Sequence, residues 1–205
     1  VNADDPVSAT SWPAVFLALL VSYLVVSACL TLAITLFSGW PGRLGLTFLP
    51  GKQREGWTGL HWRTLAADVP RLATTHGVDT FLLLVEDPEL RDTRVPGIAD
   101  AMAAAGIEML RFPIVDMQVT DDRDGLRVVL DDILARLVAG QSVAVACRGG
   151  WGRTGTIVGC LLRDGGLSPQ AAIDLTRESR RGTIERPIQE AFVAAWDWPD
   201  NTVFA

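Results

Sequence analysis

The sequence has 205 residues, of which 49% are hydrophobic and 20% are charged, and this composition excludes a disordered chain. Its formal net charge of −6 argues against nucleic acid as a partner, because that binding depends on clustered Lys and Arg. The three cysteines, Cys29, Cys147 and Cys160, are too few and too scattered for a disulfide framework or a CxxC-type zinc site. His61 and His76 are solitary as well, so we expect no metal site, and we expect no cofactor.

The N-terminal region contains a long uncharged stretch at residues 14–37. As a helix it would measure about 36 Å, which is enough to cross a hydrocarbon core of about 30 Å. Trp12 and Trp40 occupy the positions of interfacial aromatic residues, and basic residues occur only after the stretch, first Arg43 and then Lys52. This asymmetry predicts a single-pass membrane protein with a cytoplasmic C-terminal part.

Other interpretations of this stretch stay open. A cleaved secretory signal would need a basic start and a shorter apolar core, whereas the sequence begins with Asp4 and Asp5. Residues 26–29 resemble a lipoprotein cleavage box, but apolar residues follow Cys29, where a mature lipoprotein would become polar. The stretch could also be a buried helix or strands of a soluble domain, or reflect a misassigned gene start.

The predicted organisation is an N-terminal tail at 1–12, a transmembrane helix at 13–38 and a folded domain at 39–205. Strands separated by helices in this domain imply a mostly parallel sheet covered on both faces, hence a three-layer α/β fold. In chain order, hydrophobic periodicity and helix caps predict a strand at 43–49, a helix at 62–75, a strand at 80–85, a helix at 98–105, a strand at 107–112, a helix at 126–138, a strand at 142–146, a helix at 154–163, and two helices that begin at Ser168 and Pro187.

The reactive side chains lie between the last strand and the helix that follows it, where Cys147 and Arg153 have Cys-x5-Arg spacing. Three glycines let backbone N–H groups turn inward before a helix N-terminus, which favours a tetrahedral dianion. Arg153 can bind two oxygens of that anion, and the same positive field favours a thiolate at Cys147. We therefore predict thiolate attack on a phosphate monoester. The predicted phosphate-binding residues are Arg148, Gly149, Gly150, Trp151, Gly152 and Arg153.

The leaving oxygen needs a proton, which a carboxylic acid from another loop should supply. Asp116 follows a predicted strand and is the first choice for this general acid. Asp121 and Asp122 are the alternatives, although they and Asp124 could instead cap and solvate the helix that begins near Leu126.

Further short segments accompany the loop in a fixed order: LGL at 44–46, LPG at 49–51, VP at 95–96, GI at 106–107, PI at 113–114, LSPQ at 167–170 and AI at 172–173, followed by Ile184, Gln189 and Phe192. With the loop, they make residues 44–196 resemble the cysteine-dependent dual-specificity and protein-tyrosine phosphatases, above all the kinase-associated phosphatases. The loop alone would be weak evidence. The resemblance implies a phosphatase fold and a phosphorylated protein as the substrate.

The resemblance also implies roles for individual residues. Cys147 would be the nucleophile, Arg153 the phosphate ligand, Asp116 the general acid, and the Thr154 hydroxyl would stabilise the thiolate as a leaving group. Gln189 stands where the family allows an amide that positions water, although it could equally be an exposed helix residue.

The sequence departs from the family at two loop positions. Ala146 replaces the usual His, so weak activity is conceivable, as is an inactive phosphoprotein-binding module tethered to a membrane. Trp151 replaces an aliphatic residue and could line the pocket or pack under the turn. Arg148 is the only basic residue beside the glycines, where phosphoinositide-type phosphatases carry lysines, and this favours a protein substrate over a lipid.

A rhodanese-like sulfurtransferase is a distant third interpretation, because it has no need of Asp116.

Two groups outside the loop are expected to have structural roles. Cys160 is expected to pack in the core rather than to act as a redox partner of Cys147. Arg177, Arg180 and Arg181 are expected to form a solvated helix end, although one of them could contact substrate or brace the loop.

Overall fold

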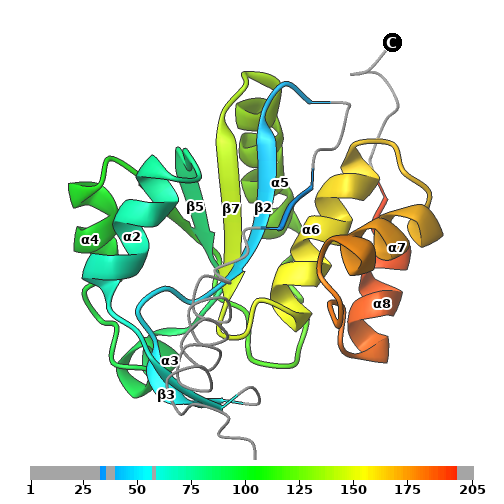
Figure 1. The fold of residues 1–205 in the computed structure, drawn as a ribbon. Coiled ribbons are helices and arrows are strands. Elements are labelled where there is room, and N and C mark those ends of the chain that lie inside the picture. Colours follow the sequence, from blue (N-terminus) through cyan, green and yellow to red (C-terminus); the bar gives the residue numbers. More distant parts are fainter. Residues whose placement is uncertain (1–32, 36–39, 57–58, 198–205) are drawn as a thin grey trace, which may run out of the picture. The chain divides into compact units, whose positions relative to one another are not determined.

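A five-stranded sheet forms the centre of the structure, a computed structural model that describes residues 33–35, 40–56 and 59–197 (Figure 1). The strand order is β1-β2-β7-β5-β6. Four strands run parallel and the edge strand β1 runs antiparallel to β2, which confirms the predicted mostly parallel sheet. The strands are β1 (Ala33–Thr35), β2 (Arg43–Phe48), β5 (Thr80–Leu83), β6 (Glu108–Arg111) and β7 (Ser142–Cys147).

Helices cover both faces of this sheet. Alternate residues of the central strands, including Leu82 and Val145, pack with the apolar side chains of α5 and α6 in one core cluster. The intervening Phe81 and Leu83 are also fully buried and point to the other face, because successive strand residues alternate. Figure 1 shows α2 and α4 on one side and α6, α7 and α8 on the other. The helices are α2 (Leu65–Thr74), α3 (Asp87–Asp92), α4 (Ile98–Ala104), α5 (Arg123–Val138), α6 (Gly152–Asp164), α7 (Pro169–Ser179) and α8 (Pro187–Ala194).

The predicted elements of the folded domain are present, but some boundaries differ. The helix predicted to begin at residue 62 begins at Leu65, after Thr64 accepts a hydrogen bond from the Ala67 N–H as its cap. Residues just before it form a hairpin of β3 (Gln53–Gly56) and β4 (Gly59–Trp62) that was not predicted. The short helix α3 was also missed, because six residues offer too little periodicity to detect.

The predicted membrane-spanning helix at residues 13–38 is wrong. Ala33–Thr35 form β1, which pairs with residues 44–46 of β2, whereas a helix that crosses hydrocarbon must satisfy its backbone hydrogen bonds internally. Trp40, expected at a membrane interface, is 6% exposed and packs in the core. Within 33–35, 40–56 and 59–197, no helix combines the length and apolarity needed to cross a bilayer. The rest of the stretch and the tail at 1–12 lie outside the described residues.

That correction removes the basis for the predicted membrane partner and for the single-pass topology with a cytoplasmic domain. Hydropathy misled the prediction because an apolar edge strand and an apolar helix have similar composition. The pairing partner that distinguishes them lies beyond a turn, in β2.

Candidate active site

Cys147 is the last residue of β7 and is 3% exposed. Its Sγ accepts a hydrogen bond from the Gly150 N–H at 3.2 Å, and its own N–H donates to Thr154 Oγ1 at 2.8 Å. Gly150 has a φ of +72°, and a Cβ there would lie 2.5 Å from the Thr47 carbonyl oxygen. Only glycine fits this turn, which aims a backbone N–H at the sulfur.

The loop leads directly into α6, whose first turn carries no acidic residue. The positive end of the helix dipole and the N–H groups of the first turn act on the loop. A carboxylate from another segment also lies near this end, because a Cβ on Gly152 would be 2.6 Å from Glu185 Oε2. A helix start of this kind can bind an anion, which is the role that the sequence predicts for residues 148–153.

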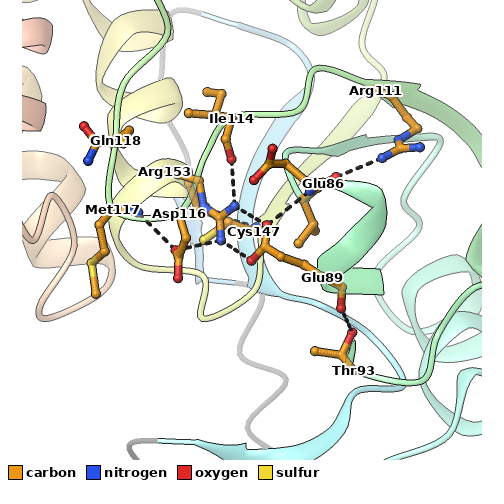
Figure 2. A network of polar contacts seen from close by, with 12 residues as sticks. Glu86, Glu89, Thr93, Arg111, Ile114, Asp116, Met117, Gln118, Cys147 and Arg153 are labelled. Atoms are coloured by element: carbon orange, nitrogen blue, oxygen red, sulfur yellow. Dashed lines mark hydrogen bonds and ion pairs between the residues drawn. The ribbon is translucent and has the colours of Figure 1, made fainter. Parts of the chain in front are cut away.

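Arg153 lies at the centre of a polar network and is 2% exposed (Figure 2). Its Nη1 donates to Glu89 Oε2 at 2.6 Å and to the Ile114 carbonyl at 2.8 Å, while its Nη2 donates to Glu89 Oε1 at 2.9 Å. Nη2 also lies 2.8 Å from Asp116 Oδ1. Among the residues that the structure describes, none is a hydrogen-bond partner for its buried Nε, so this donor of the guanidinium is available to a ligand.

The ionisation states of this pair reinforce each other. Burial disfavours the charged form of Arg153, but hydrogen bonds to Glu89 and the charges of Cys147, Glu89 and Asp116 outweigh it and raise its pKa. Burial likewise disfavours the Glu89 carboxylate, yet the hydrogen bond and charge of Arg153 lower the pKa of that carboxyl below its ordinary value. Both groups are therefore charged over the neutral pH range.

Asp116 lies on the loop after β6, and its side chain is 48% exposed beside Arg153. The Met117 N–H donates to Asp116 Oδ1 at 3.1 Å and holds the carboxylate on this side of the loop. Asp122, an alternative candidate, instead caps α5 by accepting the Gly125 N–H at 2.9 Å. The structure thus brings Asp116 to the phosphate loop, and Asp121 is an exposed neighbour of the α5 cap.

Gln189 is fully buried and lies against the loop. A Cβ on Gly152 would lie 2.8 Å from its Nε2, and its Oε1 accepts the Arg186 N–H at 3.2 Å. Its amide therefore faces the start of α6, and it is not the exposed helix residue that the sequence also allowed.

The remaining predicted positions have ordinary packing explanations. Ala146 is fully buried, between Thr47 and Leu83 of the neighbouring strands. The guanidinium of Arg180 lies over the Trp151 ring, with its central carbon 5.8 Å from the ring centre. Cys160 is in the core, where burial raises the pKa of its thiol well above the ordinary value.

Arg177 of α7 and the two arginines just after this helix have different environments. Arg177 pairs with Glu190 of α8 at 2.7 Å, whereas Arg180 donates to the Gly149 carbonyl at 3.2 Å. Arg180 therefore braces the phosphate loop, and Arg181 is exposed.

Sequence reasoning missed two residues of the site, Glu89 and Lys52. Glu89 follows β5, and the Lys52 Nζ donates to the Arg148 carbonyl at 3.1 Å. Both come shortly after a parallel strand, and the carboxyl ends of such strands meet at one edge of the sheet. Their position shortly after a strand of the parallel sheet was therefore the available signal, the same one that identified Asp116.

A family model described as "Swiss Army Knife protein, DSP-PTPase phosphatase domain" matches residues 59–193. Cyclin-dependent kinase inhibitor 3 of Rattus norvegicus is 30% identical over 139 residues, which cover 67% of this chain and 63% of that protein. The chain therefore spans less than two thirds of that relative's length.

Solved structures with the same fold include phosphatases. Kinase associated phosphatase, with its catalytic cysteine replaced by serine, has a TM-score of 0.66 and 26% identity over 74% of this chain and 83% of that chain. Tk-PTP in the active form has a TM-score of 0.60 and 27% identity over 74% of this chain and 89% of that chain. PTPMT1 in complex with PI(5)P shares the fold, with a TM-score of 0.59 and 23% identity over 75% of this chain and 88% of that chain.

Proposed function

The chain belongs to the DSP-PTPase family of phosphatase domains, and from this premise we propose that it hydrolyses phosphate monoesters of phosphoproteins through a cysteinyl-phosphate intermediate. The buried Nε of Arg153 carries the proposal. A buried polar atom without a partner is rare in proteins, and this donor lies in the site that contains Cys147 and Asp116. An oxygen of a bound phosphate would satisfy it.

In the first step, the Cys147 thiolate attacks phosphorus and the bond to the leaving oxygen breaks. Asp116 gives its proton to that oxygen, so the alcohol leaves neutral and a cysteinyl-phosphate remains. Arg153 and the loop N–H groups bind the equatorial oxygens as charge redistributes over them.

In the second step, water attacks the cysteinyl-phosphate, and the Asp116 carboxylate takes the proton from that water. The sulfur–phosphorus bond breaks and inorganic phosphate leaves. The Thr154 hydroxyl, which accepts the Cys147 N–H at 2.8 Å, is proposed to stabilise the departing thiolate. Gln189 is proposed to orient the water, because its amide faces Gly152 at the start of α6.

A protein substrate is favoured by the surroundings of Asp116. Val115 and Met117 flank it and are 55% and 36% exposed, so an apolar rim is available to the group that carries the phosphate. The likeness to a kinase associated phosphatase also supports a phosphoprotein substrate.

The decisive experiment is hydrolysis of a generic aryl phosphate in the presence of a chelator, with Cys147→Ser as the matched variant. We expect Cys147→Ser to abolish turnover, because a serine hydroxyl at neutral pH is a far poorer nucleophile than a thiolate. Calorimetry should still detect phosphopeptide binding, since the loop N–H groups and Arg153 remain.

Wild-type turnover in Cys147→Ser would remove Cys147 from the mechanism. Binding without turnover in the wild type would instead support the inactive binding module, for which Ala146 in place of the family's His is the available argument.

A further inference from the structure

Lys52 is the only lysine in the sequence, and it lies beside the phosphate loop. Its Nζ donates to the Arg148 carbonyl and lies 4.9 Å from the centre of the Phe48 ring. The residue is only 9% exposed. A lysine of this kind requires explanation, because charged groups are rarely buried unless they are paired.

No carboxylate explains it. Within 40–56 and 59–197, neither Lys52 nor Arg148 forms an ion pair with a described acidic residue, although acidic residues outnumber basic ones in the chain. Other cations near the site do have such partners, since Arg63 pairs with Asp68 and Arg153 pairs with Glu89.

Arg180 adds a third cation on the same loop. It donates to the Gly149 carbonyl at 3.2 Å, while Lys52 donates to the preceding carbonyl, that of Arg148. Two carbonyls of the loop thus accept hydrogen bonds from Lys52 and Arg180, whereas the N–H groups of the loop are proposed to bind the phosphate. The ammonium of Lys52 has three N–H donors. One of them is bound to the Arg148 carbonyl.

The electrostatics agree with this geometry. Burial, together with the charges of Arg148, Arg180 and Arg63, lowers the pKa of Lys52 to about 8, and only the charge of Cys147 acts in the opposite direction. Lys52 is therefore still largely cationic at neutral pH, in a region of concentrated positive charge.

We propose that Lys52 and Arg148, supported by Arg180, bind a second anionic group of the substrate. The preferred substrate is then a phosphopeptide with an acidic or second phosphorylated side chain beside the phosphorylated residue. The exposed apolar side chains of Val115 and Met117 favour a peptide over a small polyanion. This inference rests on the proposed function and specifies its substrate class.

The first test compares two phosphopeptides that differ only in one neighbouring residue, Asp or Asn, in reactions of the full chain at pH 7. We expect kcat/KM to be about tenfold higher for the Asp peptide, mainly through KM, which is the size expected for a close charge pair. Lys52→Gln should bring that ratio close to 1, and Lys52→Arg should keep most of it.

Arg71→Gln is the matched control, because it removes the same charge from α2, and the ratio should stay at its wild-type value. An equal rate for both peptides in the wild type, or an unchanged ratio in Lys52→Gln, would overturn the proposal.

The second test measures binding without turnover. Because the chain has one lysine, ¹³C-labelled lysine gives a single side-chain NMR signal, which can be followed in the Cys147→Ser protein. We expect the Asp peptide to shift this signal and to raise its titration midpoint, and the Asn peptide to do so much less.

These readouts separate the two proposals. If no peptide is hydrolysed but the Lys52 signal still distinguishes them, the proposed function fails and the second subsite stands. If both peptides are hydrolysed equally and shift the signal equally, the function stands and the subsite fails. A free inositol polyphosphate that moves the signal more than either peptide would overturn the choice of a peptide.

Discussion

At the scale of single residues, Arg153 is the side chain proposed to bind the phosphate. Its guanidinium is buried, charged and fixed by Glu89, Asp116 and the Ile114 carbonyl (Figure 2). A planar guanidinium held in this way presents its remaining donor, Nε, to a phosphate oxygen in a fixed orientation.

We predict that Arg153→Lys lowers kcat/KM on an aryl phosphate by at least about a hundredfold, because an ammonium cannot reproduce the planar geometry of the guanidinium and positions substrate poorly. Steady-state kinetics measure the loss, and circular dichroism checks that the variant is folded. Activity close to wild type in the folded variant would show that the loop is not the phosphate site.

Glu89 is a positioning residue, because it acts through Arg153. We predict that Glu89→Gln lowers kcat/KM by about 10- to 100-fold, by analogy with the loss of a group that orients a metal ligand. Asp87→Asn, which removes an exposed carboxylate from the same helix, is the control and should change the rate little.

The Glu89 interaction also predicts a pH dependence of stability. The pKa of Glu89 is lowered in the folded protein, so the unfolded chain binds the proton more tightly. Its contribution is present above the unfolded pKa and is lost as pH falls through the folded pKa. Denaturant titrations should show a smaller acid-induced loss of stability in Glu89→Gln, and equal losses would contradict the assignment.

At the scale of elements, α6 carries the phosphate loop at its start and is anchored at its end. Asp164, its last residue, is 3% exposed and accepts hydrogen bonds from Arg127 of α5 and from the Trp196 Nε1, both at 2.9 Å. Trp196 also stacks with Phe192 of α8, with ring centres 5.7 Å apart. This network joins α5, α6 and the segment after α8.

We predict that Trp196→Phe lowers the free energy of unfolding by about 1–3 kcal/mol, because Asp164 loses a donor in a buried position. Urea titrations measure this change, and kcat/KM at 25 °C should be unchanged because the loop lies at the other end of α6. Trp62→Phe, at a tryptophan that is 65% exposed, should cost less than about 0.5 kcal/mol. Equal losses in the two variants would argue against the network.

At the scale of the whole molecule, the compact unit that contains the site spans Leu32–Ala205, and thus begins before the predicted boundary at residue 39. The difference arises from β1, which covers the edge of β2. An uncovered strand edge exposes unpaired backbone groups and promotes association between chains.

We predict that a protein of residues 32–205 folds and keeps the kcat/KM of the full chain, whereas one of residues 39–205 melts at a lower temperature or associates. Calorimetry and light scattering compare the two. Identical melting temperatures and monomeric behaviour would show that β1 adds nothing to the sheet.

Much of the fold and of the candidate site could be read from the sequence, because the deciding information is local. The buried strands are continuous apolar runs, and Cys147 to Arg153 form one uninterrupted segment whose glycines and spacing indicate the chemistry. Asp116 could be chosen because it follows a strand of the same parallel sheet.

The tertiary structure decided whatever depends on segments far apart in the chain. Glu89 meets Arg153 across 64 positions, and Lys52 meets the Arg148 carbonyl across 96. β1 differs from an apolar helix only through its pairing with β2. Hydrophobic periodicity reports which side of an element is buried, whereas these contacts depend on which elements meet at one edge of the sheet, and that is determined by packing.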